Sequence, residues 1–485
     1  MSDNVLNHLK ESVPSDVGRQ QISYYSVALE AWRRGLTVKF YSNKRGSRYP
    51  SMAHQYSISD GVNEYYFICA RGPHTNQKAI DITQNKPEAY KYYQKAGVPT
   101  PEGSVFSFDE TSIDEIVKYG NSIGFPIVIK PTNMGGGKGV FTQIKSSEEL
   151  RQCLIEVKDV VKSKDVMVEK YITGIDYRFF VMGNEVVGAT KSYSSYVVGD
   201  GKNNIDELIK EMNKKIQRNV GHRGRTIKID KDLLNYLETQ KLTLNDIPSK
   251  NERIFLRKHG SHLGIRLNVD CTDDIDEKFK EYAVKAIQSV DGIPYGSVDM
   301  IINEEENEGV VNEINTKGEI FMHVYPMEGK ARDVPKAVID YYFPNTVRKE
   351  EKLFFEFKPI KDLFMAGLAS EIVIPKLQEE KLYHQNITLQ GKNLLSLFLR
   401  KIYKKAAFYR IMGTIYKTDE DTIDLNLYGT RNNLRLYSSF LENAETKKST
   451  IKKIDAKEPV VSNDAHAISL EVKDLHNPKS KVNLK

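Results

Sequence analysis

The sequence is poor in cysteine. Three cysteines are spread over 485 residues, at Cys69, Cys153 and Cys271. They form no C-x-x-C pair and are too few for a disulfide framework, which excludes a disulfide-stapled secreted fold and favours a reducing cytosol. No apolar run approaches the roughly 20 residues needed to cross a bilayer, and no signal peptide opens the chain. We therefore expect a cytoplasmic protein without a membrane span.

The chain also lacks a strong excess of charge of either sign. Its formal net charge is +6, from 71 Lys and Arg against 65 Asp and Glu. So small an excess gives no argument for a nucleic-acid partner. The composition is that of an ordinary globular protein, and the length is enough for about three domains.

The most informative stretch runs from Gly292 to Gly318. Its pattern predicts two short strands, Ser297 to Ile302 and Val310 to Asn315, joined by an acidic turn. We expect a hairpin that is symmetric about Glu306. This register places Ile301 and Val311 on one face, and the opposite face takes Val298, Met300, Ile302, Val310 and Ile314.

The symmetric hairpin brings two carboxylates together, because Asp299 then lies directly across from Glu313. Asn315 shares the face of Glu313, since side chains alternate along a strand. Facing carboxylates repel, and burying them unpaired costs roughly several kcal/mol. A divalent cation removes that cost, and these hard oxygen ligands suit Mg²⁺ held jointly with phosphate oxygens. The alternative is an acidic hairpin with a solvated face.

A second stretch joins an apolar strand, Phe125 to Pro131, to the glycine-rich segment Asn133 to Gly139. Glycines let backbone N–H groups approach an anion, and Lys138 adds charge. The segment is not a Walker A loop, because Thr132 stands where the first glycine belongs and a strand follows. It is either a phosphate clamp or a mobile turn.

Two basic segments have two possible interpretations each, a solvated surface or a binding role. Arg45 and Arg48 lie near Tyr49 in the first and could contact an acidic substrate. The second, Ile254 to Gly264, is rich in Arg, Lys and His.

Taken in order, the motifs between about Gln84 and Pro344 resemble those of the ATP-grasp superfamily. They read NKPEAYKYYQKAGVPTPEG, GFPIVIKP, VEKYITGIDYRFFV, YVVGDGKNNIDELI, DCTDDI, GIPYGSVDMII and VVNEINTKGEIFMHVYPMEGKARDV. The resemblance is to the ATP-grasp domains of cyanophycin synthetase and of bifunctional glutathione synthetases. It implies an α+β fold in which two subdomains close over ATP.

The resemblance also implies roles for individual residues. It assigns nucleotide binding to Lys86, Lys130, Gly136, Gly137, Lys138, Gly139, Glu169, Lys170, Tyr171 and Asp176, metal binding to Asp299, Glu313 and Asn315, and catalysis to Arg178, Lys191 and Arg257. In such proteins the position of Lys130 reaches the phosphates, Glu169 to Tyr171 reads adenine through backbone groups, and Asp176 binds the ribose. The three catalytic candidates would surround the γ-phosphate and acylphosphate oxygens.

The sequence departs from this family pattern in three places. The turn after Asn315 is shorter than the family's Asn-x-x-Pro-Gly and lacks the proline. The segment Ser261 to Gly264 replaces a glycine-rich run of cyanophycin synthetase, which puts recognition of the acceptor in doubt. The Mur-ligase-like half of that enzyme has no counterpart, which argues against cyanophycin as the product.

The segment from about Glu380 to Ala444 resembles an acylphosphatase-like, ferredoxin-type domain, with Ile468 to Leu475 offering a final strand. Leu395 and Lys417 stand where acylphosphatases need Arg and Asn. We therefore expect this domain to be structural or substrate-presenting.

The expected protein is thus α+β, built on an ATP-grasp fold. Its parts are an N-terminal pre-ATP-grasp domain (1–83), the ATP-grasp domain (84–344), a linker (345–379) and an acylphosphatase-like domain (380–485) with a flexible segment at 445–464.

The predicted activity is that of an ATP-dependent carboxylate–amine ligase, which forms an amide or peptide bond through an acylphosphate and releases ADP and phosphate. The alternatives are an ATP-grasp phosphotransferase and a non-catalytic nucleotide-binding scaffold. The expected cofactors are ATP and two Mg²⁺ ions, for which Mn²⁺ could substitute. Expected partners are small-molecule or peptide substrates, with no nucleic acid and a homo-oligomer left open.

Overall fold

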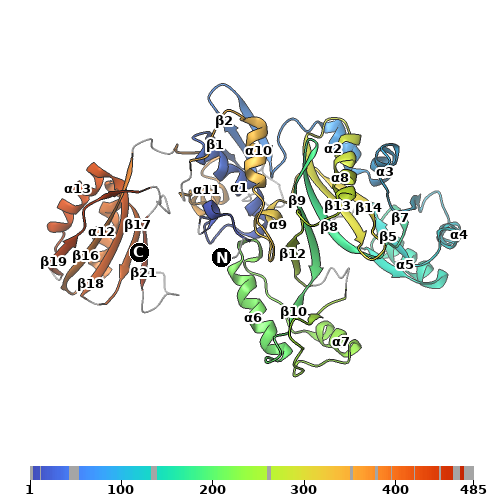
Figure 1. Ribbon diagram of the computed structural model, residues 1–485. Helices are drawn as coiled ribbons and strands as arrows, with labels where there is room; N and C mark the ends of the chain where they lie inside the picture. Colours follow the sequence, from blue (N-terminus) through green and yellow to red (C-terminus); the bar gives the residue numbers. More distant parts are fainter. Residues whose placement is uncertain are drawn as a thin grey trace. The chain divides into compact units, whose positions relative to one another are not determined.

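The computed structural model describes residues 4–10, 12–42, 54–132, 139–258, 264–349, 353–376, 381–394, 396–419, 421–446, 449–462 and 470–474. The chain forms two compact units (Figure 1). The larger comprises residues 1–5, 18–24 and 66–341, and the smaller comprises residues 6–17, 25–65 and 342–485. Residues 6–17 and 25–65, from the expected N-terminal domain, therefore group with the C-terminal part of the chain.

The first sheet of the larger unit is antiparallel, with the order β4-β7-β5-β6. Its strands are β4 (Gly103–Ser107), β7 (Asp165–Lys170), β5 (Ile127–Pro131) and β6 (Phe141–Ile144). Helices α4 (Ile113–Ile123) and α5 (Ser147–Asp159) pack together and share a core with it. Helix α4 begins with a capping box, in which Ser112 and Glu115 each bond the other's backbone N–H.

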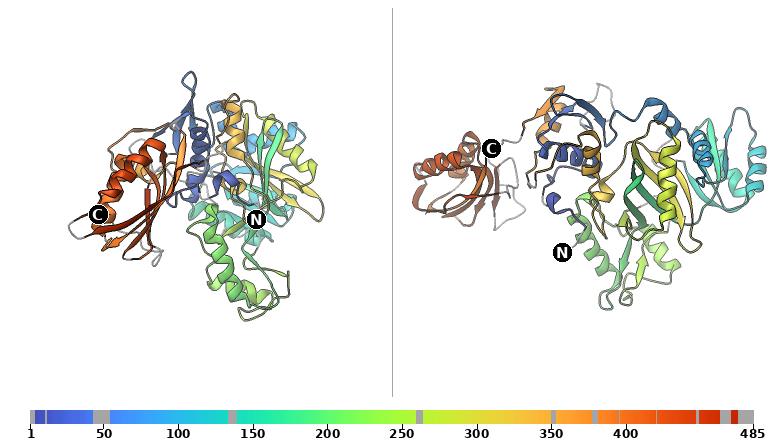
Figure 2. Two further views of the ribbon diagram at one scale, coloured as in Figure 1. Left: turned by 60° about the vertical axis from the view of Figure 1, so that its left-hand side comes forward. Right: turned by 45° about the horizontal axis from the view of Figure 1, so that its top comes forward.

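The second sheet has five antiparallel strands in the order β12-β9-β8-β13-β14. They are β12 (Arg266–Asp270), β9 (Glu185–Ser194), β8 (Ile175–Met182), β13 (Tyr295–Asn303) and β14 (Glu308–Asn315). Helix α8 (Glu277–Ser289) packs on β8, β9, β13 and β14 (Figure 2). Helices α2 (Gln77–Gln84) and α3 (Lys86–Lys95) pack on β14, and α3 also packs on α8. The predicted central hairpin is therefore β13–β14, with β14 at the edge of the sheet.

A smaller substructure extends from the second sheet. It pairs β10 (Tyr196–Val198) with β11 (Arg253–Phe255) and adds α6 (Ile205–Arg218), the 3-10 helix η2 (Val220–His222) and α7 (Lys231–Thr239) around a separate core. Two helices close the unit, α9 (Phe321–Val324) and α10 (Val334–Tyr342).

The smaller unit contains a sheet of order β15-β1-β2-β3. Its elements are η1 (Asn7–Leu9), α1 (Arg19–Arg33), whose first turns belong to the larger unit, β1 (Thr37–Tyr41), β2 (Gln55–Ser59), β3 (Glu64–Ile68), which continues into the larger unit, α11 (Lys358–Met365) and β15 (Glu371–Ile374). The segment expected as a linker, 345–379, thus supplies a helix and an edge strand that pairs with β1.

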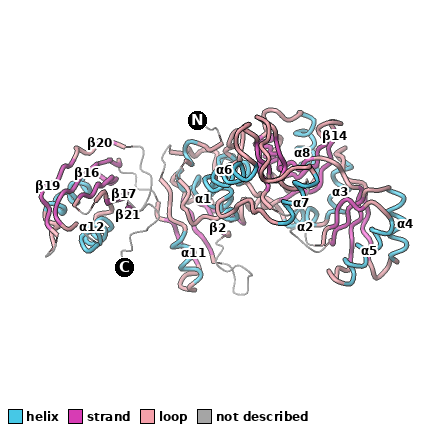
Figure 3. Tube along the Cα trace, turned by 90° about the horizontal axis from the view of Figure 1, so that it is seen from below, coloured by secondary structure: helices cyan, strands magenta, loops and turns pink. Residues whose placement is uncertain are grey.

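The C-terminal sheet runs β19-β16-β18-β17-β21 and is accompanied by α12 and α13. Figure 3 shows β19, β16, β17 and β21 together with α12. The elements are β16 (Leu382–Lys392), α12 (Ser396–Phe408), β17 (Met412–Lys417), β18 (Thr422–Thr430), α13 (Arg431–Glu442), β19 (Thr450–Ala456), β20 (Val460–Val461) and β21 (Leu470–Asp474). The strand–helix–strand–strand–helix–strand order is of the ferredoxin type. Its fourth strand is β19, so the expectation of a flexible segment at 445–464 was wrong for residues 450–456, which pair with β16. The relation to acylphosphatases stays a prediction, and Leu395 lies outside the described residues.

Within the part of the chain that the structure describes, no helix combines the length and apolar character needed to cross a membrane.

Candidate functional site

A cleft of about 1280 Å³ opens between the two sheets of the larger unit. Ten of the predicted site residues line it, namely Lys86, Lys130, Glu169, Lys170, Tyr171, Asp176, Arg178, Asp299, Glu313 and Asn315. They come from β5 and β7 on one side and from β8, β13 and β14 on the other, with Lys86 at the start of α3. Residues more than 200 positions apart in the sequence therefore meet in a single cavity.

Lys130 is held by a buried carboxylate. Its Nζ forms an ion pair with Glu169, whose side chain is 3% exposed, and the Tyr90 hydroxyl donates to Glu169 Oε1 at 3.0 Å. Burial lowers the pKa of Lys130, and Glu169 opposes that shift. The arrangement aims a cation into the cleft from the first sheet and fixes it through side chains of β7 and α3.

The hairpin contains a β-bulge that sequence reasoning missed. Asp299 pairs with Glu313 as predicted, but Met300 then pairs with Val311, so Asn312 is the extra residue on β14. The backbone N–H of Val311 bonds the Pro99 carbonyl instead, at 2.8 Å. The prediction of a symmetric register was therefore wrong beyond the carboxylate pair.

The bulge exchanges the faces of two valines. Val311 is fully buried in the core with Met300, whereas Val310 is only partly buried. The predicted assignment of Val310 to the core face and of Val311 to the carboxylate face was thus inverted. No residue type in β14 signals this bulge, because Asn312 is an ordinary polar residue in an edge strand.

Asn312 turns into the cleft and joins the two lysines. Its Oδ1 accepts hydrogen bonds from Lys86 Nζ at 3.1 Å and from Lys130 Nζ at 3.5 Å. Lys86 is placed at the first turn of α3, which the Asn85 side chain caps. The bulge therefore brings two cations from separate elements to within reach of one amide oxygen.

Each carboxylate of the predicted metal pair has a cationic neighbour. Arg178 Nε and Nη2 bond the two Asp299 oxygens at 2.5 and 2.6 Å, and Lys86 Nζ lies 3.4 Å from Glu313 Oε2. Both carboxylates are only partly buried. Sequence reasoning considered only a cation as the partner of this pair and missed Arg178, which strand pairing places directly beside Asp299.

Arg178 sits at the centre of these charges. Burial alone would lower its pKa, but Asp299 and then Glu319 outweigh burial and raise the pKa above its ordinary value. Asn315, the third predicted metal ligand, pairs with Ser297 across the hairpin, and its Oδ1 accepts from the Lys317 backbone N–H at 3.2 Å. The side chains of Asp299, Glu313 and Asn315 therefore supply oxygen donors at the cleft.

The segment predicted to read adenine is anchored by its own backbone. Lys170 N–H bonds the Glu102 carbonyl at 2.8 Å, and Tyr171 N–H bonds the Pro126 carbonyl at 2.9 Å. The Lys170 ammonium bonds carbonyls at the C-terminal end of α4, at 3.0 and 3.1 Å. These contacts fix the segment Glu169 to Tyr171 where it borders the cleft. The backbone N–H groups of Lys170 and Tyr171 are both used in these contacts.

Asp176, the predicted ribose ligand, is bound by an arginine from the neighbouring part of the sheet. Arg266 Nη1 lies 2.7 Å from Asp176 Oδ2. Arg266 lines the cleft, as do Arg19, Arg71 and Lys317, and the motif comparison identified none of these four. Arg19, Arg71 and Arg266 lie in segments that carry no motif, whereas Lys317 lies within the last of the motifs, and folding brings all four to the site.

Two predicted catalytic residues do not line the cleft. Lys191 Nζ pairs with Glu304 Oε1 at 2.5 Å, near the hairpin turn. Arg257 is buried at 6% exposure, with Nη2 2.5 Å from Asp230 Oδ2 at the N-cap of α7. In the glycine-rich segment Asn133 to Gly139, the residues Gly136, Gly137 and Lys138 lie outside the described residues. Parts of the two basic segments, namely Arg45, Arg48, Tyr49 and 261–263, also lie outside them. Gly139 is described, with a φ of +69°, and borders Pro131 and Val161.

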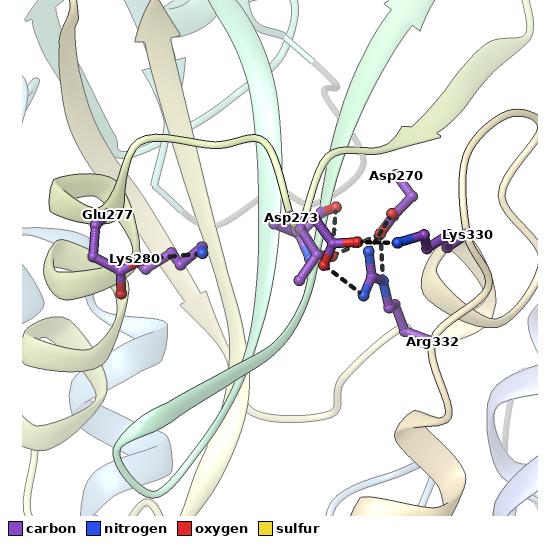
Figure 4. A network of polar contacts seen from close by, with 8 residues as sticks. Asp270, Asp273, Glu277, Lys280, Lys330 and Arg332 are labelled. Atoms are coloured by element: carbon purple, nitrogen blue, oxygen red, sulfur yellow. Dashed lines mark hydrogen bonds and ion pairs between the residues drawn. The ribbon is translucent and has the colours of Figure 1, made fainter.

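A polar network behind the cleft fixes the end of β12 (Figure 4). Arg332 bonds both Asp270 oxygens at 2.9 and 2.6 Å, and Asp273 accepts from Arg332 and Lys330 at 3.0 and 2.6 Å. Arg332 and then Lys330 lower the pKa of Asp273. This network ties the loop after α9 to β12, whereas the Glu277–Lys280 pair in the same view belongs to the first turn of α8.

Two buried histidines lie close to the same strands. His323 on α9 is fully buried beside Gly188, and burial and then Arg178 lower its pKa to about 3. His222 in η2 bonds the Arg266 carbonyl at 3.1 Å, and burial lowers its pKa to about 4. Both imidazoles are therefore neutral near pH 7.

Comparison with known proteins agrees with this geometry. Residues 85–183 match the family model described as "Carbamoyl-phosphate synthase L chain, ATP binding domain". This matched region includes Lys86, Lys130, Glu169 and Asp176. The chain therefore contains an ATP-grasp domain, as its motifs indicated.

This domain is homologous to parts of larger enzymes. The chain is 30% identical over 313 residues to cyanophycin synthetase of Trichormus variabilis, which covers 63% of this chain and 34% of the relative. It is 28% identical over 357 residues to the glutathione biosynthesis bifunctional protein of Clostridium perfringens, covering 71% and 44%. The chain thus spans between a third and a half of the length of these relatives.

Among solved structures, a bifunctional glutathione synthetase from Pasteurella multocida aligns with a TM-score of 0.48 at 27% identity, covering 60% of this chain and 41% of that one.

Proposed function

We propose that the protein is an ATP-dependent carboxylate–amine ligase that forms an amide or peptide bond. One observation carries this proposal: a single cleft unites two lysines held on Asn312 with the facing carboxylates Asp299 and Glu313. Cations for phosphates and oxygen donors for a metal are the two requirements of phosphoryl transfer from ATP. The homologous regions belong to a cyanophycin synthetase and to a glutathione biosynthesis bifunctional protein.

The donor set fits Mg²⁺. Asp299, Glu313 and Asn315 offer hard oxygens at the cleft, and Arg178 orients the Asp299 carboxylate through two hydrogen bonds. These residues would hold Mg²⁺, which when bound supplies neutralisation of phosphate charge. We infer two ions, with Mn²⁺ able to substitute.

The residues of the chain bind and orient the nucleotide. Lys86 and Lys130 face the same space and would contact the β- and γ-phosphates in place of Asn312. Glu169 and Tyr90 hold Lys130 in position, so its cation does not need to reorganise during the reaction.

The chemical steps follow from the substrates. A carboxylate oxygen attacks the γ-phosphorus, and the bond from that phosphorus to the bridging oxygen of ADP breaks. The resulting acylphosphate carbonyl is attacked by an amine, which loses a proton, and inorganic phosphate leaves. The products are an amide, ADP and phosphate. Arg178, at the edge of the metal ligands, would stabilise the negative charge that moves from the carboxylate to the phosphate.

The test measures ADP release from the full chain with Mg²⁺ and ATP over amino acids, short peptides and cell-wall precursors, with mass spectrometry of the products. We expect ADP release that depends on both a carboxylate and an amine. The mass of the product should equal the mass of the carboxylic acid plus that of the amine minus that of water. The Asp299→Asn variant should lose this activity, whereas Glu308→Gln at the far end of β14 should keep it. ADP release without an amine and with a phosphorylated product would show a phosphotransferase, and no ADP release from any mixture would favour a scaffold.

For the cell, we infer a cytoplasmic enzyme acting on small molecules or peptides, without nucleic acid. A homo-oligomer remains compatible with this proposal, and native mass spectrometry would determine the assembly.

A further inference from the structure

Five arginines gather at the end of the cleft next to α9. They come from five separate places in the chain and form what we call the arginine cluster: Arg19 at the start of α1, Arg71 after β3, Arg178 on β8, Arg225 after η2 and Arg266 on β12. Four of them line the cleft. The charges of Arg225, Arg178 and Arg266 all act on Arg19, so these four lie close together, and Arg71 lines the same cleft.

Two members of the arginine cluster have carboxylate partners. Arg178 binds Asp299 through two nitrogens, and its Nη1 lies 3.5 Å from Glu319. Arg266 binds Asp176 at 2.7 Å. The positive charge of these two arginines is therefore compensated within the protein.

The other three members form no ion pair with any residue that the structure describes. Neutral groups hold them instead. The Arg19 guanidinium lies 4.3 Å from the Phe321 ring centre, Arg71 Nη1 donates to Thr316 Oγ1 at 3.1 Å, and Arg225 Nη2 donates to the Gly264 carbonyl at 2.9 Å. Three guanidinium groups are thus positioned without an ion pair, although the charge of Glu319 also acts on Arg19 and opposes the effect of the neighbouring arginines.

This arrangement is costly without an anion. Burial lowers the pKa of Arg19, Arg71 and Arg225, and for Arg19 the charge of Arg225 adds to that effect. His222 contributes no further charge, because burial lowers its pKa to about 4. Partly desolvated like charges repel, and their side chains are already restricted, so an anion that joins them loses little to reorganisation.

The position of the cluster separates it from the nucleotide phosphates. Lys86 and Lys130 serve the phosphate end of the cleft from α3 and β5. Arg71, in contrast, is bound to Thr316, the residue after the metal-ligand candidate Asn315. Arg71 therefore lies beside the proposed metal site, where the reacting carboxylate has to meet the γ-phosphate.

We propose that the arginine cluster recognises a ligase substrate that carries at least one carboxylate beyond the one that reacts. The guanidinium fork matches a carboxylate with two parallel hydrogen bonds, and arginines from several elements can bind more than one carboxylate. This inference rests on the proposed ligase function and adds to it the chemical class of the substrate.

The test compares two acids of equal shape, glutarate and its monoamide glutaramate, by calorimetry on the full chain saturated with Mg²⁺ and a non-hydrolysable ATP analogue. We expect glutarate to bind more tightly by about 10-fold or more, because it adds one charge-assisted pair of hydrogen bonds. Arg71→Gln and, separately, Arg19→Gln should reduce this preference to about twofold or less. Affinity for the ATP analogue should stay within about twofold in both variants, which also reports an intact fold.

A matched control is Arg435→Gln on α13, an exposed arginine whose neighbour is Asn432. It should keep the full preference for glutarate. Equal affinity for the two acids in the wild type, no saturable binding of either acid, or an undiminished preference in both cluster variants would overturn the inference. Tighter binding of phenyl phosphate than of glutarate would overturn it in favour of a phosphorylated substrate. Failure of the ligase proposal can be distinguished from failure of this inference. It would appear as absent binding of the ATP analogue and absent release of ADP, whatever the affinities for the two acids.

Discussion

Arg178 and Asp299 are direct neighbours on β8 and β13, and two hydrogen bonds of 2.5 and 2.6 Å join their side chains. Asp299 is at the same time the register partner of Glu313 on β14. The arginine therefore orients one carboxylate of the metal pair before any cation binds. This relationship makes the acidic pair compatible with a stable fold and leaves Glu313 as the carboxylate that is less tightly held.

Replacement of Glu313 should separate function from stability. In Glu313→Gln, the loss of one charge weakens the proposed metal site, while the contact with Lys86 at 3.4 Å is exposed enough to cost little. We expect ADP release to be abolished, with a melting temperature equal to that of the wild type. Near-normal turnover at saturating Mg²⁺ would refute the metal assignment.

The amide at the bulge should matter for nucleotide affinity. In Asn312→Ala, Lys86 and Lys130 lose the oxygen that holds them together, and we expect the dissociation constant for ATP to rise about 10-fold. Fluorescence titration with a labelled ATP analogue measures this constant. Asn303→Ala, at the hairpin turn, serves as the control and should bind ATP like the wild type. Unchanged affinity in Asn312→Ala would show that the lysines are positioned by other contacts.

The Lys130–Glu169 pair predicts a rescue experiment. Lys130→Met leaves the buried Glu169 carboxylate uncompensated and should lower the free energy of unfolding by about 3–5 kcal/mol. The double variant Lys130→Met with Glu169→Gln should recover most of that loss but should not recover ATP binding. Urea unfolding and nucleotide titration give the two values. Equal stability of the single and double variants would contradict the buried pairing.

The buried histidines predict how stability depends on pH. An unfolded histidine binds a proton as the pH falls through about 6.5, whereas the pKa of native His222 is about 4 and that of native His323 about 3. Between these values the unfolded state binds more protons, so the free energy of unfolding falls as the pH falls, by about 1.4 kcal/mol per pH unit for each histidine.

Urea unfolding of the wild type and of His323→Phe between pH 7 and pH 4.5 tests this dependence. The variant should show a shallower slope, because the contribution of His323 is removed. His74→Asn, at an exposed position, should reproduce the slope of the wild type. A variant slope as steep as that of the wild type would show that other groups cause the loss of stability.

The C-terminal domain should lack acylphosphatase activity. Lys417 stands where the resemblance requires Asn, and Leu395 stands where it requires Arg, so the domain lacks the guanidinium fork that would bind the phosphate. We expect benzoyl phosphate to hydrolyse at its spontaneous rate in the presence of the full chain without ATP. Hydrolysis well above that rate would instead suggest an editing role toward acylphosphates released from the ligase site.

The sequence predicted the elements whose chemistry is local. The apolar runs of β5, β7 and β13 and the pairing of Asp299 with Glu313 follow from alternation and turn residues, which act over a few positions. The bulge at Asn312 does not, because it depends on contacts of β14 with Pro99 and with the lysines of two other elements. The same reason applies to the arginine cluster. Its members are separated by up to 247 positions, from Arg19 to Arg266, and no spacing rule connects them.

Lys191 and Arg257 are residues that the sequence assigned to the site but that do not line the cleft in the structure. Both were assigned to catalysis by resemblance to basic positions of a family, yet in this structure Lys191 pairs with Glu304 and Arg257 pairs with Asp230. Whether either reaches the substrate when the cleft is filled stays a prediction. A motif identifies the strand or loop to which a residue belongs, but the partner of a long charged side chain is decided by the acids that the fold places nearby.

The bulge also divides the β13–β14 hairpin into two stretches with independent alignment. On the side of the carboxylates, pairing follows the frame set by Ser297 and Asn315, and beyond Asn312 it follows a frame shifted by one residue. A change in the length of the acidic turn would alter the strand pairing between the turn and Asn312. The bulge would accommodate this change, so the pairing on the side of the carboxylates would stay the same. The tip between Glu306 and Asn307, both exposed, is therefore a place where an epitope or a fluorescent tag can be inserted without displacing the metal ligands.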